Sequence, residues 1–303
     1  RRVRVTLDET RGRFHTISAP GYLPGSWSFC FDQQGGFDWQ QSLPEPSAFL
    51  LVEEVWRSCE SAGWPALDVV IDTSEFRDAG SGLKLGLGSS AAVAVTLAAA
   101  LRAFASLDDD DGRIAMDAHG RFQGGRGSGA DVATCLRGGL IEYRRSAVRP
   151  VSWPRGLHYG YLWSGQSAAT TDKLARLGDG RVRNDKDKRM ELLGKRAEDV
   201  AGAWSRGDAG EVLGSLAGFV DALRQFSDEH GLGVFDAGHD ALARLASEQG
   251  VVYKPCGAGG GDIGIVLAAR ERDVDVFCKT ARQSGFQELD LLLDDKGLEQ
   301  GRE

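Results

Sequence analysis

The sequence lacks the features that mark membrane-spanning and nucleic-acid-binding proteins. Its longest apolar run, residues 91–101, ends at Arg102 and is well short of the roughly 20 residues that cross a bilayer. Basic residues are not in excess, since 36 Lys and Arg stand against 44 Asp and Glu, for a formal net charge of -8. Such a chain does not present the broad basic surface that nucleic acid or an anionic membrane attracts. We therefore expect no nucleic-acid or membrane partner. The expected location is the cytoplasm, and the expected state is a monomer or a homodimer.

Cysteine is scarce and scattered. The five cysteines are odd in number, and no two stand at the CxxC spacing typical of zinc and redox motifs. A disulfide framework needs paired cysteines, usually in a small secreted chain. The sequence therefore predicts reduced thiols at Cys30, Cys59, Cys135, Cys256 and Cys278.

Strand and helix patterns alternate along the chain, which predicts an α+β fold. The 303 residues suffice for two domains, and Pro150 and Pro154 favour a boundary that gives domains 1–155 and 156–303. Alternation and short apolar runs predict strands at residues 3–7, 67–71, 140–143, 158–163 and 263–268. Helical spacing predicts helices at residues 47–62, 186–204, 210–230 and 236–249, besides the alanine-rich stretch that follows residue 90.

The segment KLGLGSSAA, residues 84–92, joins a glycine-rich turn to the start of that alanine-rich helix. Backbone N–H groups at such a turn and at a helix N-terminus attract phosphate, and Gly86 and Gly88 leave room for it. The hydroxyl of Ser89 or Ser90 can ligate Mg²⁺ between phosphates, and Lys84 adds a positive charge. A tight connection whose serines cap the helix explains the same residues equally well.

Two more glycine loops favour the phosphate interpretation. GSGAD, residues 127–131, places the Asp131 carboxylate after a flexible turn, and GAGGGD occupies residues 257–262. Each glycine costs about 0.5 to 1 kcal/mol of backbone entropy relative to alanine. We therefore expect some group to approach the backbone of residues 257–262 closely.

Together, KLGLGSSAA, GRGSGADVA and KPCGAGGGDIGI resemble the motifs of the GHMP small-molecule kinases, most of all the phosphomevalonate kinase branch. The motifs agree in order and spacing across about residues 80–290, and Cys256 replaces the family's usual serine. The resemblance implies a domain like the second domain of ribosomal protein S5, followed by a ferredoxin-like domain. It also implies that the family's first motif, with its Pro-Gly-Lys turn, lies upstream of residue 1.

The resemblance further implies the reaction and its residues. ATP and Mg²⁺ would phosphorylate 5-phosphomevalonate to 5-diphosphomevalonate, with Asp131 at the family's catalytic aspartate. The triphosphate would be held by Gly86, Leu87, Gly88, Ser89 and Ser90, and Mg²⁺ by Ser90. The loop with Gly257, Ala258, Gly259 and Gly260 would close on the phosphates or the acceptor, and other substrate contacts are expected from Ser128, Gly129, Arg144, Ser167, Thr170 and Asp262.

The chemistry of the acceptor refines these roles. A phosphate monoester has a second pKa of about 6, so its oxygen is already ionised at neutral pH and needs no base. The harder task is to offset the repulsion between two polyanions. We therefore assign electrostatic catalysis to Lys84, and to Asp131 the orientation of a lysine or of Mg²⁺. A kinase for mevalonate or a sugar would instead use Asp131 as a base, and a catalytically silent homologue would only bind its ligand.

Other polar residues carry weaker expectations. His119 is predicted near the end of a helix, partly facing solvent, and residues 108–111 read as a solvated acidic loop. Arg144 suits bidentate binding of a phosphate or carboxylate. Ser167 and Thr170 either hydrogen-bond the substrate or cap the following helix.

Overall fold

Contacts divide the chain into two compact units that are discontinuous in the sequence. The computed structural model describes residues 1–59, 63–107, 111–125, 127–144, 147–167 and 188–301. The first unit comprises Arg1–Ala79, Gly88–Arg149 and Asp294–Glu303, and the second comprises Gly80–Leu87 and Pro150–Leu293. The continuous domains 1–155 and 156–303 stay a prediction. The units defined by contacts differ from them in that the segment Gly80–Leu87 belongs with the second unit.

The first unit is built on a five-stranded sheet in the order β1-β5-β2-β3-β4. Strands β2 and β5 run parallel, and the other neighbours are antiparallel. Buried residues alternate with less buried ones along β2 and β5, as expected for a sheet with one covered face. The strands are β1 (Arg4–Glu9), β2 (His15–Ala19), β3 (Leu23–Phe31), β4 (Phe37–Trp39) and β5 (Leu67–Asp72).

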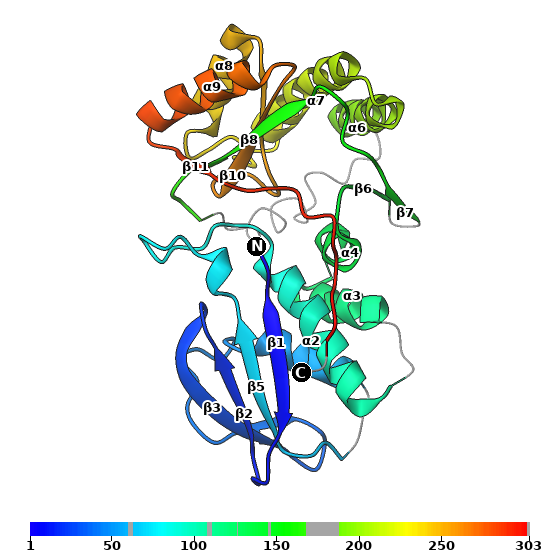
Figure 1. Ribbon diagram of the computed structural model, residues 1–303, viewed down its shortest axis with the longest axis vertical. Coiled ribbons are helices and arrows are strands. Elements are labelled where there is room, and N and C mark those ends of the chain that lie inside the picture. The colour runs from blue at the N-terminus through cyan, green and yellow to red at the C-terminus, as the bar shows by residue number, and fades with distance from the viewer. Residues whose placement is uncertain (60–62, 108–110, 126, 145–146, 168–187, 302–303) are drawn as a thin grey trace. The chain divides into compact units, whose positions relative to one another are not determined.

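Helices pack against this sheet and against one another (Figure 1). The central one, α2, buries four alanines together with valine and leucine side chains. Apolar side chains of the sheet and the helices share one core that includes Phe29, Leu97 and Ile114. The remaining elements are α1 (Leu50–Ser58), the short 3-10 helix Ser74–Phe76, α2 (Ser89–Ala105), α3 (Asp111–Phe122), α4 (Ala130–Arg137), β6 (Ile141–Arg144) and β7 (Ala147–Pro150).

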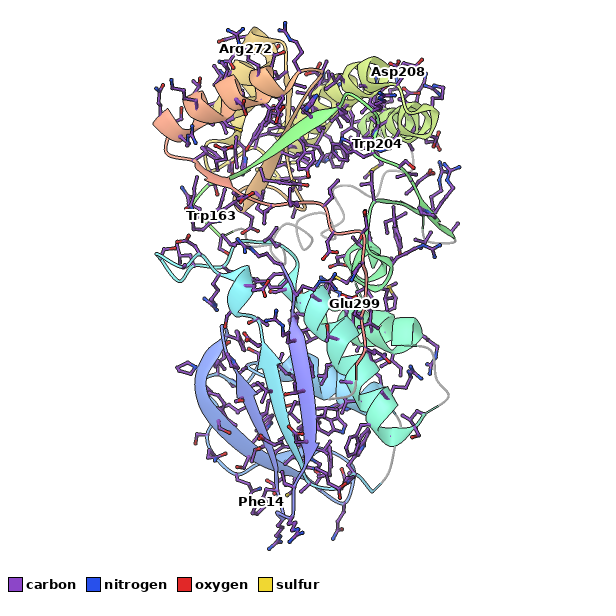
Figure 2. The ribbon with its side chains drawn as sticks, in the orientation of Figure 1. Phe14, Trp163, Trp204, Asp208, Arg272 and Glu299 are labelled. Carbon is purple, nitrogen blue, oxygen red and sulfur yellow. The ribbon has the colours of Figure 1, made fainter. Side chains whose placement is uncertain are left out.

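The second unit contains a four-stranded antiparallel sheet in the order β11-β8-β10-β9. Helix α9 packs on β8, while α6 and α7 pair with each other. Asp208 caps α7 by accepting a 2.8 Å hydrogen bond from the Glu211 amide. Trp204, at the end of α6, makes an edge-to-face contact with Trp153. Asp208 and Trp204 are labelled in Figure 2. The elements are β8 (His158–Trp163), α6 (Lys188–Arg206), α7 (Ala209–Glu229), α8 (His239–Gln249), β9 (Val252–Pro255), β10 (Ile263–Ala268), α9 (Glu271–Gln283) and β11 (Gln287–Leu289).

The α+β class predicted from the sequence is confirmed, and strands β8 and β10 have the predicted bounds. Strands β2 to β4 and helix α9 were not predicted. All five cysteines are free. Within the part of the chain that is described, no helix is long and apolar enough to span a membrane.

Candidate functional site

The N-terminus of α2 is headed by glycine, so no N-cap side chain covers its first-turn amides. Gly88 takes the left-handed conformation, with φ of 77°, which glycine adopts without strain. The Ser90 hydroxyl lies 3.1 Å from Nε2 of His119. The serine therefore contacts a neighbouring helix, and Gly88 occupies the N-cap position considered for serine.

The N-terminus of α4 repeats this arrangement. Gly129 is its left-handed N-cap, with φ of 82°, and Asp131 lies in the first turn. One oxygen of Asp131 accepts a 2.9 Å hydrogen bond from the Val132 amide, and the other lies 3.9 Å from Nε2 of His119. The Asp131 side chain is 41% exposed, so its carboxylate remains accessible.

His119 joins these two helix N-termini. It lies in the last turn of α3 and is only 1% exposed, so the prediction that it partly faces solvent is wrong. Burial lowers the pKa of His119, and the nearby Asp131 carboxylate partly offsets this. The neutral ring can exchange a hydrogen bond with Ser90 through Nε2. The sequence offered one signal for this role, the position of His119 in the helix that leads to GSGAD. A single histidine has too many structural uses to be assigned to a site from sequence alone.

The turn before α4 is held by its own chain. The Tyr143 hydroxyl donates a 2.6 Å hydrogen bond to the Ser128 carbonyl, and a methyl group on Gly129 would overlap the Met116 sulfur. Packing therefore explains this glycine without a ligand.

In the second unit, the segment leading to α2 meets the third glycine loop. Leu85 belongs to an apolar cluster with Trp163 (labelled in Figure 2) and Ile263, while Lys84 is exposed. Gly86 has φ of 76°, and a methyl group there would overlap the Asp262 carboxyl group. The structure thus brings together two segments that lie far apart in the sequence.

The loop at residues 257–262 uses part of its backbone internally. The Gly259 amide donates to the Cys256 carbonyl at 3.1 Å, and the Gly260 amide donates to the Val234 carbonyl at 2.7 Å. A methyl group on Gly259 would overlap that Val234 carbonyl. The close approach expected at this loop is therefore made, at Gly259, by the chain itself. Among described residues, no atom lies within 4 Å of the methyl position at Gly257.

The other predicted substrate contacts lie elsewhere. Arg144, on the β6–β7 hairpin, is exposed and pairs with Glu142 at 3.2 Å. Ser167 is exposed, whereas Thr170 and the acidic residues 108–110 lie outside the described residues.

Two oxygen donors of the first unit suit Mg²⁺. Ser90 and Asp131 both place an oxygen within 4 Å of the same His119 nitrogen. Over the described stretches of the chain, no three His, Cys, Asp or Glu side chains gather as a metal site. Magnesium commonly takes one or two protein ligands and completes its octahedron with phosphate oxygens and water. A hydroxyl and one carboxylate therefore fit such an ion, provided that a phosphate is bound.

Comparison with known proteins finds a matching domain and a related sequence. The family described as GHMP kinases N terminal domain matches residues 51–139. The phosphomevalonate kinase of Streptomyces sp. (strain CL190) is 30% identical over 242 residues, which span 70% of this chain and 64% of that protein. The chain thus matches less than two thirds of the length of this relative.

Solved structures share the fold. Phosphomevalonate kinase of Streptococcus pneumoniae, in complex with phosphomevalonate and AMPPNP, aligns over 95% of this chain and 88% of its own, with a TM-score of 0.75 and 16% identity. Galactokinase of Lactococcus lactis, complexed with galactose, aligns over 98% of this chain and 86% of its own, with a TM-score of 0.69 and 16% identity. Identities this low establish the fold alone. Residues 51–139 thus match the GHMP kinase N-terminal domain, part of the chain is similar to a phosphomevalonate kinase sequence, and the chain has the fold of the GHMP kinases.

Proposed function

We propose that this protein transfers a phosphoryl group from ATP to 5-phosphomevalonate, giving ADP and 5-diphosphomevalonate. The observation that carries the proposal is the meeting of Ser90 and Asp131 on His119, at two helix N-termini headed by glycine. Such N-termini favour bound anions because their amides point outward at the positive end of the helix dipole. The related phosphomevalonate kinase sequence supports the choice of acceptor.

The residues then take separate roles. The first-turn amides of α2, with Gly86, Leu87, Gly88 and Ser89, hold the triphosphate, and Lys84 offsets negative charge as the phosphoryl group moves. The other predicted contacts, including Ser128, Ser167, Thr170 and the 257–262 loop, remain proposals for the acceptor.

Magnesium would be held by Ser90 and Asp131, and when bound it supplies positive charge between phosphate oxygens. His119 keeps the Ser90 hydroxyl oriented through their 3.1 Å contact. Asp131 acts by orientation, since an ionised phosphate acceptor needs no base.

Kinases for alcohols share this fold, as the galactokinase structure shows, and they are the second candidate. The deciding experiment measures ADP release by the full-length protein with phosphomevalonate, mevalonate, homoserine and galactose in turn. We expect turnover with phosphomevalonate above the others. Turnover with an alcohol alone would replace the proposal by an alcohol kinase, and ATP binding without any turnover would indicate a silent homologue.

A further inference from the structure

A buried polar network lies behind the 257–262 loop. His239, the first residue of α8, is fully buried. Its Nδ1 lies 2.8 Å from the Tyr253 hydroxyl, and its Nε2 lies 3.0 Å from the Gly261 carbonyl oxygen. Buried polar atoms are costly unless they are hydrogen-bonded, so this network has one defined arrangement.

The partners fix the tautomer of the histidine. A carbonyl oxygen only accepts hydrogen bonds, so Nε2 must carry the proton and donate to Gly261. In the neutral ring Nδ1 is then an acceptor, which the Tyr253 hydroxyl fills as donor. Burial raises the pKa of Tyr253, so its hydroxyl keeps that proton.

Packing leaves the His239 ring little freedom. Its centroid lies 5.9 Å from that of Tyr253, nearly parallel, and 5.5 Å from that of Phe286, nearly edge-on. The N-cap before it, Gly238, has φ of 86°, and a methyl group there would come within 3.0 Å of the Phe286 ring. Backbone and ring are therefore held from both sides.

This ring holds one end of a specific peptide group. The peptide between Gly261 and Asp262 gives its carbonyl to His239, and its N–H donates to the Gln166 carbonyl at 2.7 Å. Gly261 has φ of 148° and Asp262 has φ of 55°, conformations that are rare for residues with side chains. Glycine tolerates many conformations, so these two hydrogen bonds help to select one orientation of this peptide.

We propose that His239 is a positioning residue which, through the Gly261 carbonyl, holds the 257–262 loop in the conformation that binds an ionised phosphoryl group. The same anchor sets the position of Asp262, whose carboxyl group lies against Gly86. The role of the loop in binding phosphate rests on the proposed function; its anchoring by His239 rests on the network alone.

Two substitutions separate the hydrogen bonds of the ring. In His239→Gln the side-chain amide nitrogen reaches the place of Nε2 and still donates to Gly261. In His239→Asn the side chain reaches only the place of Nδ1, so the Gly261 carbonyl loses its donor. Tyr253→Phe is a milder variant, since it removes only the donor that fixes the tautomer. His15→Asn, at a buried histidine of the first unit, is the matched control.

The first measurement is amide exchange of the peptide covering residues 256–263, in protein without substrate. We expect His239→Asn to exchange at least about fivefold faster than wild type, Tyr253→Phe to lie between, and His239→Gln to stay close to wild type, on the scale of one buried hydrogen bond. His15→Asn should leave this peptide unchanged. Equal exchange rates in the Asn and Gln variants would overturn the anchoring. If His239→Asn does not fold, an exchange rate of Tyr253→Phe equal to that of wild type would overturn it.

The second measurement is KM and kcat for MgATP and phosphomevalonate. His239→Asn should raise the KM for either MgATP or phosphomevalonate by about fivefold or more, and His239→Gln should have a KM close to that of wild type. A purely structural role would lower the melting temperature and leave both KM values unchanged. A KM that does not follow the exchange rates would overturn the link to phosphate binding. If wild type turns over no acceptor, the proposed function fails, and the exchange experiment still decides the anchoring.

Discussion

At the scale of single residues, Lys84 is the side chain on which the proposed chemistry depends most. Replacing it by alanine should lower kcat by at least about 100-fold, because one preorganised electrostatic contact to the transition state is worth that much. Lys279→Ala is the matched control, an exposed lysine on α9 of the same unit. Steady-state kinetics check this, and a Lys84→Ala rate within a few-fold of wild type would remove the lysine from the mechanism.

A substitution at Asp131 distinguishes a role in orientation from a role as catalytic base. Asp131→Asn should give a slower enzyme whose rate still rises with pH through the ionisation of the acceptor near pH 6 and is flat above about pH 7. Asp117→Asn, an exposed carboxylate on α3, should behave as wild type. The measurement is the pH profile of kcat with phosphomevalonate. A basic limb present in wild type and abolished by Asp131→Asn would show that the carboxylate is a base.

His15 makes the stability of the first unit depend on pH. Its ring stacks on Phe29, and its Nδ1 accepts a hydrogen bond from the Leu67 amide at 3.2 Å. Burial lowers the pKa of His15 from 6.5 to about 4. Between these values the unfolded chain binds a proton that the folded chain does not, so stability falls as pH drops from about 6.5 to about 4.

His15→Asn keeps an acceptor near Nδ1 and cannot titrate in this range. The free energy of unfolding, measured with urea at pH 7 and at pH 4.5, should therefore favour wild type less at the lower pH. A difference between the two proteins that does not change with pH would exclude His15 as the titrating group.

At the scale of elements, the turn between Lys84 and α2 offers two glycines with nearly equal φ angles, 76° at Gly86 and 77° at Gly88. Alanine at either position costs about 1 to 2 kcal/mol for the left-handed conformation. At Gly86 a methyl group also overlaps Asp262, whereas at Gly88 no described atom lies within 4 Å. Gly86→Ala should lower the melting temperature further, since relieving an overlap costs about 1 to 3 kcal/mol more. Equal melting temperatures would contradict the contact with Asp262.

At the scale of the whole molecule, MgATP should raise the melting temperature, because a ligand that binds only the folded protein stabilises it by mass action. The gain is about 2.7 kcal/mol when the ligand is at 100 times its dissociation constant. ATP with EDTA should give a smaller shift, since Ser90 and Asp131 then lack the ion that links them to the phosphates. No shift at millimolar MgATP would count against every kinase interpretation.

Several strands and helices of the fold could be predicted from local sequence patterns. The run at Ile263–Ala268 is almost wholly apolar because strand β10 is largely buried, and both it and His158–Trp163 keep the predicted bounds. Strands β2 to β4 were not predicted: Gly21 follows the short strand β2, Gly25 interrupts β3, and β4 has only three residues. Their pairing with one another, and the pairing of β2 with the distant strand β5, makes them strands.

The sequence by itself determined the family resemblance, the order of the glycine loops and the candidates Ser90 and Asp131, because spacing and residue type are properties of the linear chain. Only the tertiary structure decided that His119 joins those two residues and that Val234, rather than a ligand, fills the space beside Gly259. These contacts join residues far apart in the sequence, and a hydrogen bond or a close approach depends on distance in space, which neither periodicity nor composition records.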